Sequence, residues 1–192
     1  GLKPANSIWL WGQGRSLSIP TFQEKYGITG AVISAVDLVK GLGICAGLKP
    51  IEVPGATGYL DTNYEGKARA AREALHSVDF VFLHVEAPDE ASHKGSLDEK
   101  LQAIEDFDRR VVKLVLEGLQ EKFSDYRVLV LPDHPTPIAI KTHASDPVPF
   151  ALLSSGKNTV TGHTASGFNE RAAAQSGLFI ENGWELMDKL IS

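Results

Sequence analysis

Short, uninterrupted apolar runs alternate along this chain with longer stretches of helical pattern. The runs do not alternate apolar with polar residues, which is typical of strands covered on both faces. Strands separated by helices indicate βαβ units and a mainly parallel sheet. We therefore expect an α/β fold with three layers, α/β/α, in which helices cover both faces of the sheet. The expected strands are residues 8–10, 31–33, 80–83, 128–131 and 148–153.

Two helix signals lie between the expected strands 31–33 and 80–83. Residues 36–45 have a helical pattern, although glycines lower its helix propensity. Residues 62–75 are rich in alanine and begin with Thr62 and Glu65, the residue pair of a capping box. The sequence therefore predicts a helix in each of these two segments.

The strongest helix signal covers residues 96–119. It begins with Ser96 and Glu99, a second capping-box pair. Its apolar residues recur every three or four positions, so we expect one buried face. That face consists of Leu97, Leu101, Ile104, Val111, Val115 and Leu119. Further along, Asn169 and Asn182 are expected to cap short helices.

Composition narrows the functional classes. The chain has 192 residues, of which 43% are hydrophobic and 22% charged, an ordinary globular balance for one sizeable domain. A net charge of −5 argues against a nucleic-acid partner bound through a broad basic face. No apolar stretch approaches the roughly 18 to 20 residues that span a bilayer, so no membrane partner is expected.

The N-terminus and the cysteine count predict the cellular compartment of the protein. The first residues lack the charged and apolar zones of a signal peptide. The single cysteine, Cys45, excludes an internal disulfide and fits the reducing cytoplasm. We expect a cytoplasmic protein in which Cys45 is a small core residue.

Polar residues follow the expected strand 80–83. Asp89 and His93 are four residues apart, so on one helical turn their side chains project from the same face and can meet on one ion. An exposed polar loop is the alternative for this pair taken alone. Parallel α/β folds gather ligands at the carboxyl ends of their strands, which favours the site.

A second pair, Asp133 and His134, follows the expected strand 128–131 in a loop that contains three prolines. A stiff loop suits a metal site because its ligands are held in place beforehand. The alternative is a proline-rich turn with a solvated acid and imidazole. His143 precedes the last expected strand; a lone histidine there is more often structural or exposed.

Taken together, these residues change the interpretation. Two carboxylates and three imidazoles at strand ends suit zinc or manganese better than magnesium. Five ligands exceed one tetrahedral site with an open position. They fit a pair of ions roughly 3.5–4 Å apart, as in many phosphatases. The five candidates are Asp89, His93, Asp133, His134 and His143.

Other motifs carry weaker signals. His84 lies at a strand end near these residues and is a candidate for orienting a ligand from behind. His76 ends a helix pattern, and His163 is expected in a loop. The glycine-rich segments 12–14 and 41–43 match neither a dinucleotide fingerprint nor a Walker motif.

The candidate segments resemble a known family. Residues 87–93, 131–137 and 142–149 are similar to motifs of the cofactor-independent (2,3-bisphosphoglycerate-independent) phosphoglycerate mutases, in their archaeal-type branch, within the alkaline phosphatase superfamily. Further matching segments are 9–14, 36–43 and 54–67. The likeness covers nearly all of this chain but only about the C-terminal half of the family's length.

The resemblance implies specific roles. Asp89, His93 and His143 match the ligands of one divalent ion, and Asp133 and His134 match two ligands of another. The ions would be Mn, Zn, Co or Mg. Lys40, on its own more often a surface lysine, would hold the phosphate of a small phosphorylated acid, phosphoglycerate.

The resemblance also implies that parts are missing. Residues 1–192 would be the C-terminal part of the metal-binding domain, without the N-terminal segment that carries a nucleophilic serine and without the cap domain. No serine of this chain lies in the nucleophile motif, so no catalytic residue is assigned and we expect the chain alone to be inactive. The full-length enzyme would interconvert 2- and 3-phosphoglycerate through a phosphoserine.

Alternatives remain open at this point. The superfamily also contains phosphatases, phosphodiesterases and phosphonate-processing enzymes. A non-catalytic metal-binding module is a further possibility. A missing strand would leave an exposed sheet edge, through which two copies can associate.

Overall fold

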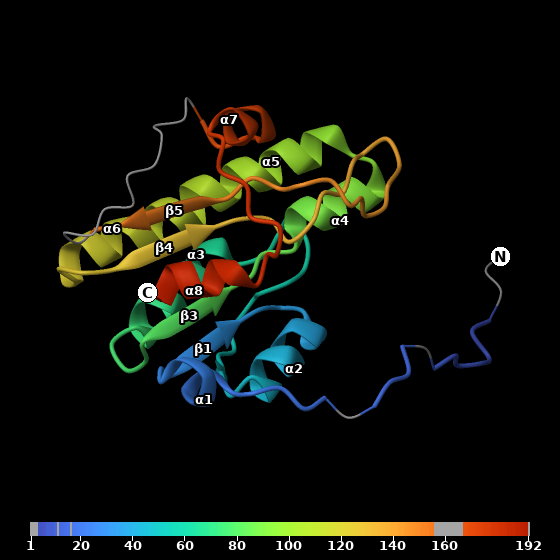
Figure 1. The fold of residues 1–192 in the computed structure, drawn as a ribbon. Coiled ribbons are helices and arrows are strands. Elements are labelled where there is room, and N and C mark those ends of the chain that lie inside the picture. Colours follow the sequence, from blue (N-terminus) through green and yellow to red (C-terminus); the bar gives the residue numbers. More distant parts are fainter. Residues whose placement is uncertain (1–3, 11, 16, 156–166, 192) are drawn as a thin grey trace.

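In a computed structural model of the chain, residues 4–10, 12–15, 17–155 and 167–191 are described. A three-stranded parallel sheet has the order β2-β1-β3, and Figure 1 shows β1 and β3 side by side. It consists of β1 (Gly30–Ile33), β2 (Lys49–Pro50) and β3 (Phe80–Leu83). β1 and β3 pair in register from Gly30↔Phe80 to Ile33↔Leu83, so both strands end at the same edge. The predicted α/β fold is confirmed.

Helices cover the central strand on both faces. All four residues of β1 are buried, which requires cover above and below. On one face α2 (Asp37–Cys45) approaches so closely that a Cβ at Gly43 would lie 2.6 Å from Val32 Cγ1. α3 (Tyr64–Ala74) packs against β1 and β3, and its Tyr64 and Ala68 join the core.

The last two strands form a separate sheet. β4 (Arg127–Val130) and β5 (Ala151–Ser154) pair antiparallel, so the expected strand 148–153 is shorter and reversed in direction. α8 (Glu185–Ile191) packs against β4, where Arg127 Nη1 donates to the Leu190 carbonyl at 3.0 Å. Among the described residues, β3 pairs only with β1, and β4 only with β5.

The long helix is interrupted. α5 (Leu97–Phe107) and α6 (Lys113–Lys122) are joined by a π-helical turn, Asp108–Val112. The wider turn rotates the side chains before it relative to those after it. The expected single apolar face is therefore wrong in its first half. Val111 and Leu119 are buried, whereas Leu97, Leu101 and Ile104 are 57%, 52% and 47% exposed.

Helix caps follow the sequence in part. Ser96 caps α5 by accepting from the Glu99 N–H, as predicted. The Glu99 carboxylate pairs with Lys94 Nζ at 3.2 Å instead of the Ser96 N–H, so the predicted capping box is only half formed. α3 begins one residue later than expected, because the Asn63 side chain caps it, while Thr62 Oγ1 accepts from Thr57 N. The Thr62–Glu65 capping box is thus wrong. The remaining helices are α1 (Phe22–Tyr26), α4 (Ala87–Lys94) and α7 (Glu170–Gln175), the last capped by Asn169.

Two local expectations are wrong. Residues 8–10 form no strand, and Trp9 is 86% exposed, because the described part of the chain offers them no pairing partner. Cys45, expected in the core, is instead an exposed free cysteine at the C-terminal end of α2. Within the described ranges, no helix combines the length and apolar character needed to cross a bilayer.

Candidate metal centre

The first candidate ligands come from α4, just beyond the end of β3. Proline in the first turn of α4 suits a helix start, where its missing N–H costs no hydrogen bond. Asp89 lies in that first turn and His93 one turn later. The spacing brings Asp89 Oδ2 to 3.1 Å from His93 Nε2. The helical pair predicted from the sequence is therefore formed.

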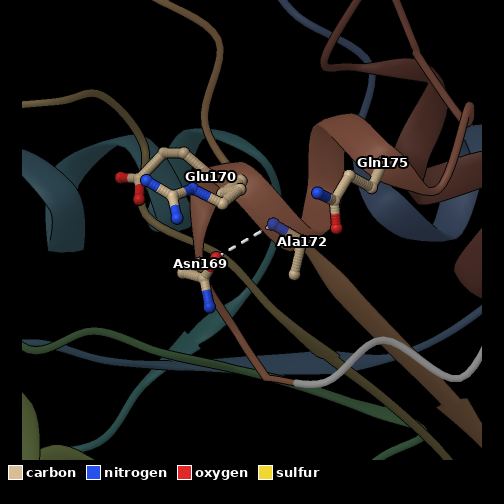
Figure 2. Close-up of a pocket in the computed structure, with 5 residues that line it drawn as sticks. Asn169, Glu170, Ala172 and Gln175 are labelled. Atoms are coloured by element: carbon tan, nitrogen blue, oxygen red, sulfur yellow. Dashed lines mark hydrogen bonds between the residues drawn. The ribbon is translucent and has the colours of Figure 1, made fainter.

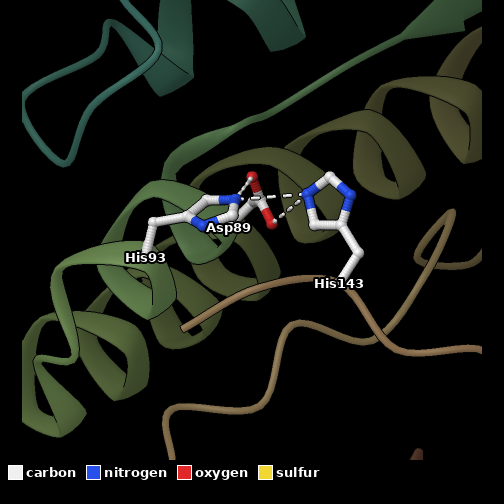
Figure 3. A group of neighbouring side chains, drawn as sticks. All are labelled: Asp89, His93 and His143. Carbon is white, nitrogen blue, oxygen red and sulfur yellow. Dashed lines mark hydrogen bonds and ion pairs between the residues drawn. The ribbon is translucent and has the colours of Figure 1, made fainter. Parts of the chain in front are cut away.

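His143 reaches the same point from the loop before β5 (Figure 3). Its Nε2 lies 3.2 Å from His93 Nε2 and 3.7 Å from Asp89 Oδ1. One ligand atom from each of the three residues lies within 4.8 Å of the others. We call Asp89, His93 and His143 the Asp89 group.

A backbone carbonyl orients His93. Lys141 has a left-handed backbone conformation, with φ 54°, and its carbonyl oxygen lies 2.9 Å from His93 Nδ1. A carbonyl only accepts, so Nδ1 carries the hydrogen and, in the neutral ring, Nε2 presents its lone pair to Asp89. The same hydrogen bond raises the pKa of His93. Metal-bound histidines are commonly held by such a contact.

Asp133 and His134, which we call the Asp133 pair, lie beside this group. His134 Nε2 is 3.3 Å from Asp133 Oδ2. The ring centroids of His134 and His143 are 3.8 Å apart, so the pair adjoins the Asp89 group. The Asp133 side chain is 76% exposed, compared with 23% for Asp89. All five predicted ligands are thus brought into neighbouring positions.

A buried polar network lies at the edge where β1 and β3 end. His84 Nδ1 is 3.1 Å from Ser34 Oγ, and His84 Nε2 is 3.1 Å from Glu86 Oε2. Lys67 is fully buried and donates to the His84 carbonyl at 3.1 Å. Burial lowers the pKa of Lys67 to about 8 and also lowers the pKa of His84. For Glu86, burial and then the nearby Asp89 raise the pKa.

Sequence reasoning missed Thr136. This residue is 5% exposed, and its hydroxyl hydrogen-bonds Asp89 Oδ1 and lies 3.3 Å from His134 Nδ1. Lys100 Nζ donates to the Thr136 carbonyl at 2.8 Å. The sequence does contain a signal that could have identified this residue, because a hydroxyl side chain follows His134 by two positions and is fixed between two prolines.

Other sequence candidates lie in different surroundings. Lys40 Nζ is 3.1 Å from Asp37 Oδ1 and 3.2 Å from Glu52 Oε1, and these contacts raise its pKa. His76 stacks near Phe123, with ring centroids 5.7 Å apart. His163 and the Trp11 position of the segment 9–14 lie outside the described residues.

A pocket at α7 is separate from these ligands. It is lined by α7 residues and by Asn169, whose side chain accepts from the Ala172 N–H at 2.9 Å (Figure 2). None of the predicted ligands lines it. Asn169 is already used as the helix cap, so this pocket adds no donor to the candidate centre.

The chemistry of the donor set fits divalent ions. Carboxylate and neutral imidazole are ligands of Zn, Mn and Co, and Asp89 with Nε2 of both His93 and His143 close to it is a favourable arrangement around a cation. The Lys141 carbonyl supplies the supporting contact that such sites use. Residues 3–184 match the family model for the metalloenzyme superfamily.

The chain belongs to the metalloenzyme superfamily. It is 57% identical over 192 residues to a protein of Methanothrix thermoacetophila named 2,3-bisphosphoglycerate-independent phosphoglycerate mutase, covering 100% of this chain and 48% of that protein. The chain spans about half the length of the curated relatives it matches.

Two solved structures have a fold similar to that of this chain. The PH0037 protein from Pyrococcus horikoshii matches with a TM-score of 0.81 and 32% identity, over 90% of this chain and 50% of that one. A cofactor-independent phosphoglycerate mutase from Thermoplasma acidophilum matches with a TM-score of 0.65 and 27% identity, over 90% of this chain and 38% of that one. The resemblance inferred from the motifs is therefore confirmed.

Proposed function

We propose that this chain is the metal-binding part of a phosphoglycerate mutase that interconverts 2- and 3-phosphoglycerate. The convergence of Asp89, His93 and His143 on one point carries this proposal. The names of the relatives that match this chain over its whole length support the choice of substrate. Residues 1–192 are then the C-terminal part of the metal-binding domain.

The ligands divide between two ions in this proposal. The Asp89 group holds the first ion with three side chains, and the Asp133 pair supplies two ligands to the second. Divalent ions bound there withdraw charge from phosphoryl oxygens and lower the pKa of a coordinated hydroxyl. Mn, Zn, Co and Mg are all candidates, because these donors separate them only weakly.

The chain's own residues position these ligands. The α4 turn holds Asp89 and His93 on one face, and the Lys141 carbonyl keeps the hydrogen of His93 on Nδ1. The network of Ser34, His84 and Lys67 fixes the turn between β3 and α4. These contacts hold the metal face in place before any substrate arrives.

The nucleophile is proposed to come from outside the matched half. A serine hydroxyl there attacks the phosphorus of phosphoglycerate, the bond to the glycerate oxygen breaks, and that oxygen takes up a proton. The glycerate then turns, and its neighbouring hydroxyl takes the phosphoryl group back. A cap that excludes water prevents hydrolysis of the phosphoserine. We therefore propose that residues 1–192 alone are inactive.

The role of Lys40 also remains a proposal. To hold a substrate phosphate, its ammonium must exchange its contacts with Asp37 and Glu52 for the phosphate oxygens. The contacts keep the lysine charged, which suits this role. A Lys40→Met variant of the complete gene product is expected to raise KM for phosphoglycerate and to leave metal binding unchanged.

The free edges of β3 and β4 support a proposal about association. Neither strand has a second partner among the described residues, and unpaired edges form ladders with other chains. We propose that residues 1–192, when separated from the rest of the protein, associate through these edges. Sedimentation of the isolated chain over a range of concentrations tests this; a monomer at every concentration contradicts it.

The decisive experiment uses the complete gene product that contains this chain. It is loaded with Mn, supplied with 3-phosphoglycerate and followed by phosphorus NMR. The expected product is 2-phosphoglycerate, with little free phosphate. Release of free phosphate alone would instead identify a phosphatase, the second candidate, and metal binding without turnover would identify a non-catalytic module.

A further inference from the structure

Thr136 occupies a rigid, buried position between the two sets of ligands. Prolines 135 and 137 flank it and fix the backbone on either side. The Pro135 carbonyl accepts from Ala144 N at 2.9 Å, next to His143, and the Thr136 carbonyl accepts from Lys100 Nζ at 2.8 Å. The backbone that carries the Thr136 side chain is therefore held by contacts with two other segments of the chain.

A count of hydrogens determines what the Thr136 hydroxyl can do. It has one hydrogen and faces Asp89 Oδ1, which accepts, and His134 Nδ1 at 3.3 Å. The hydrogen goes to the carboxylate, with which the hydroxyl makes the closer contact. The hydroxyl oxygen is then an acceptor, so His134 Nδ1 must carry a hydrogen to bond it.

This arrangement has a consequence for His134. A neutral ring with its hydrogen on Nδ1 has its lone pair on Nε2. That atom lies 3.3 Å from Asp133 Oδ2, on the side of the second ion. The same hydroxyl therefore bears on one ligand of the Asp89 group and one ligand of the Asp133 pair.

We propose that Thr136 is a positioning residue that orients Asp89 and fixes His134 in the Nδ1–H form, with Nε2 as its ligand atom. This inference rests on the proposed metal-binding function. Thr136 acts through the ligands and touches neither ion. It is the one hydroxyl among the described residues that contacts both sets of ligands.

Two variants separate the hydroxyl from the methyl group. Thr136→Val keeps the branched shape and removes the hydroxyl, whereas Thr136→Ser keeps the hydroxyl and removes the methyl. Both are made in the complete gene product and titrated with Co²⁺, followed by its visible absorption. Because changes behind metal ligands typically cost 10–100-fold in affinity, we expect Val to weaken binding by about 10-fold or more and Ser by less than about 3-fold.

The result that overturns the proposal is equally specific. If Thr136 serves only to fill space, Val retains the Co²⁺ affinity and Ser loses thermal stability. Unfolding midpoints of both variants, measured without metal, identify a variant that fails to fold. Should Val misfold, Thr136→Ala together with the Ser variant gives the same comparison of hydroxyl present and absent.

A metal-free measurement keeps this test independent of the proposed function. The ¹⁵N signals of neutral His134 report which nitrogen carries the hydrogen. We expect the Nδ1–H form in the wild type and in Thr136→Ser, and a shift toward Nε2–H in Thr136→Val. An unchanged ring in Val overturns the inference, whereas wild-type protein that binds no Co²⁺ overturns the proposed function.

Discussion

The Asp89 group and the Asp133 pair are built differently. Asp89 and His93 lie on one helical turn, and His143 joins them from a loop whose Lys141 carbonyl contacts His93. The Asp133 pair comes from adjacent residues in a loop, and its carboxylate is 76% exposed. Among the described residues, the first set presents three donors and the second only two.

This difference determines how many further ligands an ion at each set of residues would need. Three donors around one point suffice for an ion with an open position. Two donors do not, so in the proposed two-ion arrangement the second ion needs further ligands besides the Asp133 pair. Among the described residues, β3 and β4 each have one edge that pairs with no other strand, so a further segment can pair there. The comparison predicts unequal metal affinities within the chain.

The largest expected effect is the loss of the tighter ion. Asp89→Asn removes the carboxylate shared by His93 and His143. Even changes behind ligands cost about 10–100-fold, so we expect affinity for the first Zn²⁺ to fall by more than about 100-fold. Competition with a chelating dye measures it in the complete gene product.

Asp133→Asn is the matched control for that change. It makes the same chemical substitution on the other side of the centre. The first Zn²⁺ is expected to bind within about 3-fold of wild type, and only the second to weaken, because the tighter site keeps all its donors. Equal losses of the first ion in both variants would contradict the division into two sets.

A second prediction concerns the buried ammonium of Lys67, near the Asp89 group. Its pKa falls from 10.5 in the unfolded chain to about 8 in the folded protein. The folded state binds the proton less strongly, so stability is lowest below pH 8 and rises toward pH 10.5. One pKa unit corresponds to about 1.4 kcal/mol, so the rise is on the order of 3 kcal/mol at most.

Lys67→Met removes this dependence. Urea unfolding at pH 7.5 and at pH 9.5 is compared between wild type and variant. We expect the wild type to gain stability relative to Lys67→Met at the higher pH. Parallel behaviour of the two proteins would show that the lysine is not desolvated. At a single pH, the stability of the variant also reflects the loss of the hydrogen-bond donor to the His84 carbonyl. The quantity to compare is therefore the change in unfolding free energy with pH.

The third prediction uses proton competition at His93. The hydrogen bond to the Lys141 carbonyl raises the pKa of His93 above 6.5, and only the neutral ring binds metal. Zn²⁺ affinity should therefore fall by up to about tenfold per pH unit once the pH drops below the pKa of His93. In metal-free protein the sign is opposite: the stabilisation from this bond is full at low pH and disappears as the pH rises through the raised pKa.

Affinities at pH 6, 7 and 8 measure this dependence. His76→Gln is the control, because His76 lies against Phe123 and contacts none of the ligands. The profile should be the same in that variant as in the wild type. A flat profile in the wild type would show that no histidine of the centre binds the ion.

The smallest effect is expected at Gly95. Gly95 and Gly177 both follow helices with positive φ, 79° and 69°. Alanine at either position costs about 1–2 kcal/mol in backbone strain. Only at Gly95 would the new Cβ meet the Lys141 side chain; at Gly177 it meets nothing within 4 Å.

The two alanine variants therefore separate strain from contact. We expect similar losses of stability, and a Zn²⁺ site weakened by at most about 3-fold only in Gly95→Ala, because the end of the Lys141 side chain must move there while the Lys141 carbonyl contacts His93. Thermal unfolding and Zn²⁺ titration measure the two quantities. Identical metal binding in both variants would remove Lys141 from the support of the Asp89 group.

Much of this arrangement follows from local sequence signals. The spacing of Asp89 and His93, and the end of each strand, depend on residues close together in the chain, so they were predictable. The reversed direction of β5 depends on which distant strand it meets. The role of Thr136 depends on a contact with Asp89 across 47 residues. Such pairings carry no periodic signal.

The π-helical turn between α5 and α6 has a consequence for the centre. It contains one residue more than a regular helix needs, and one residue turns a helix by about 100°. Deleting a residue there would rotate α5 against α6 and swing the Lys100 ammonium away from the loop it now grips. The extra residue of the π-helical turn thus determines, from a distance, how the loop beside the candidate metal centre is held.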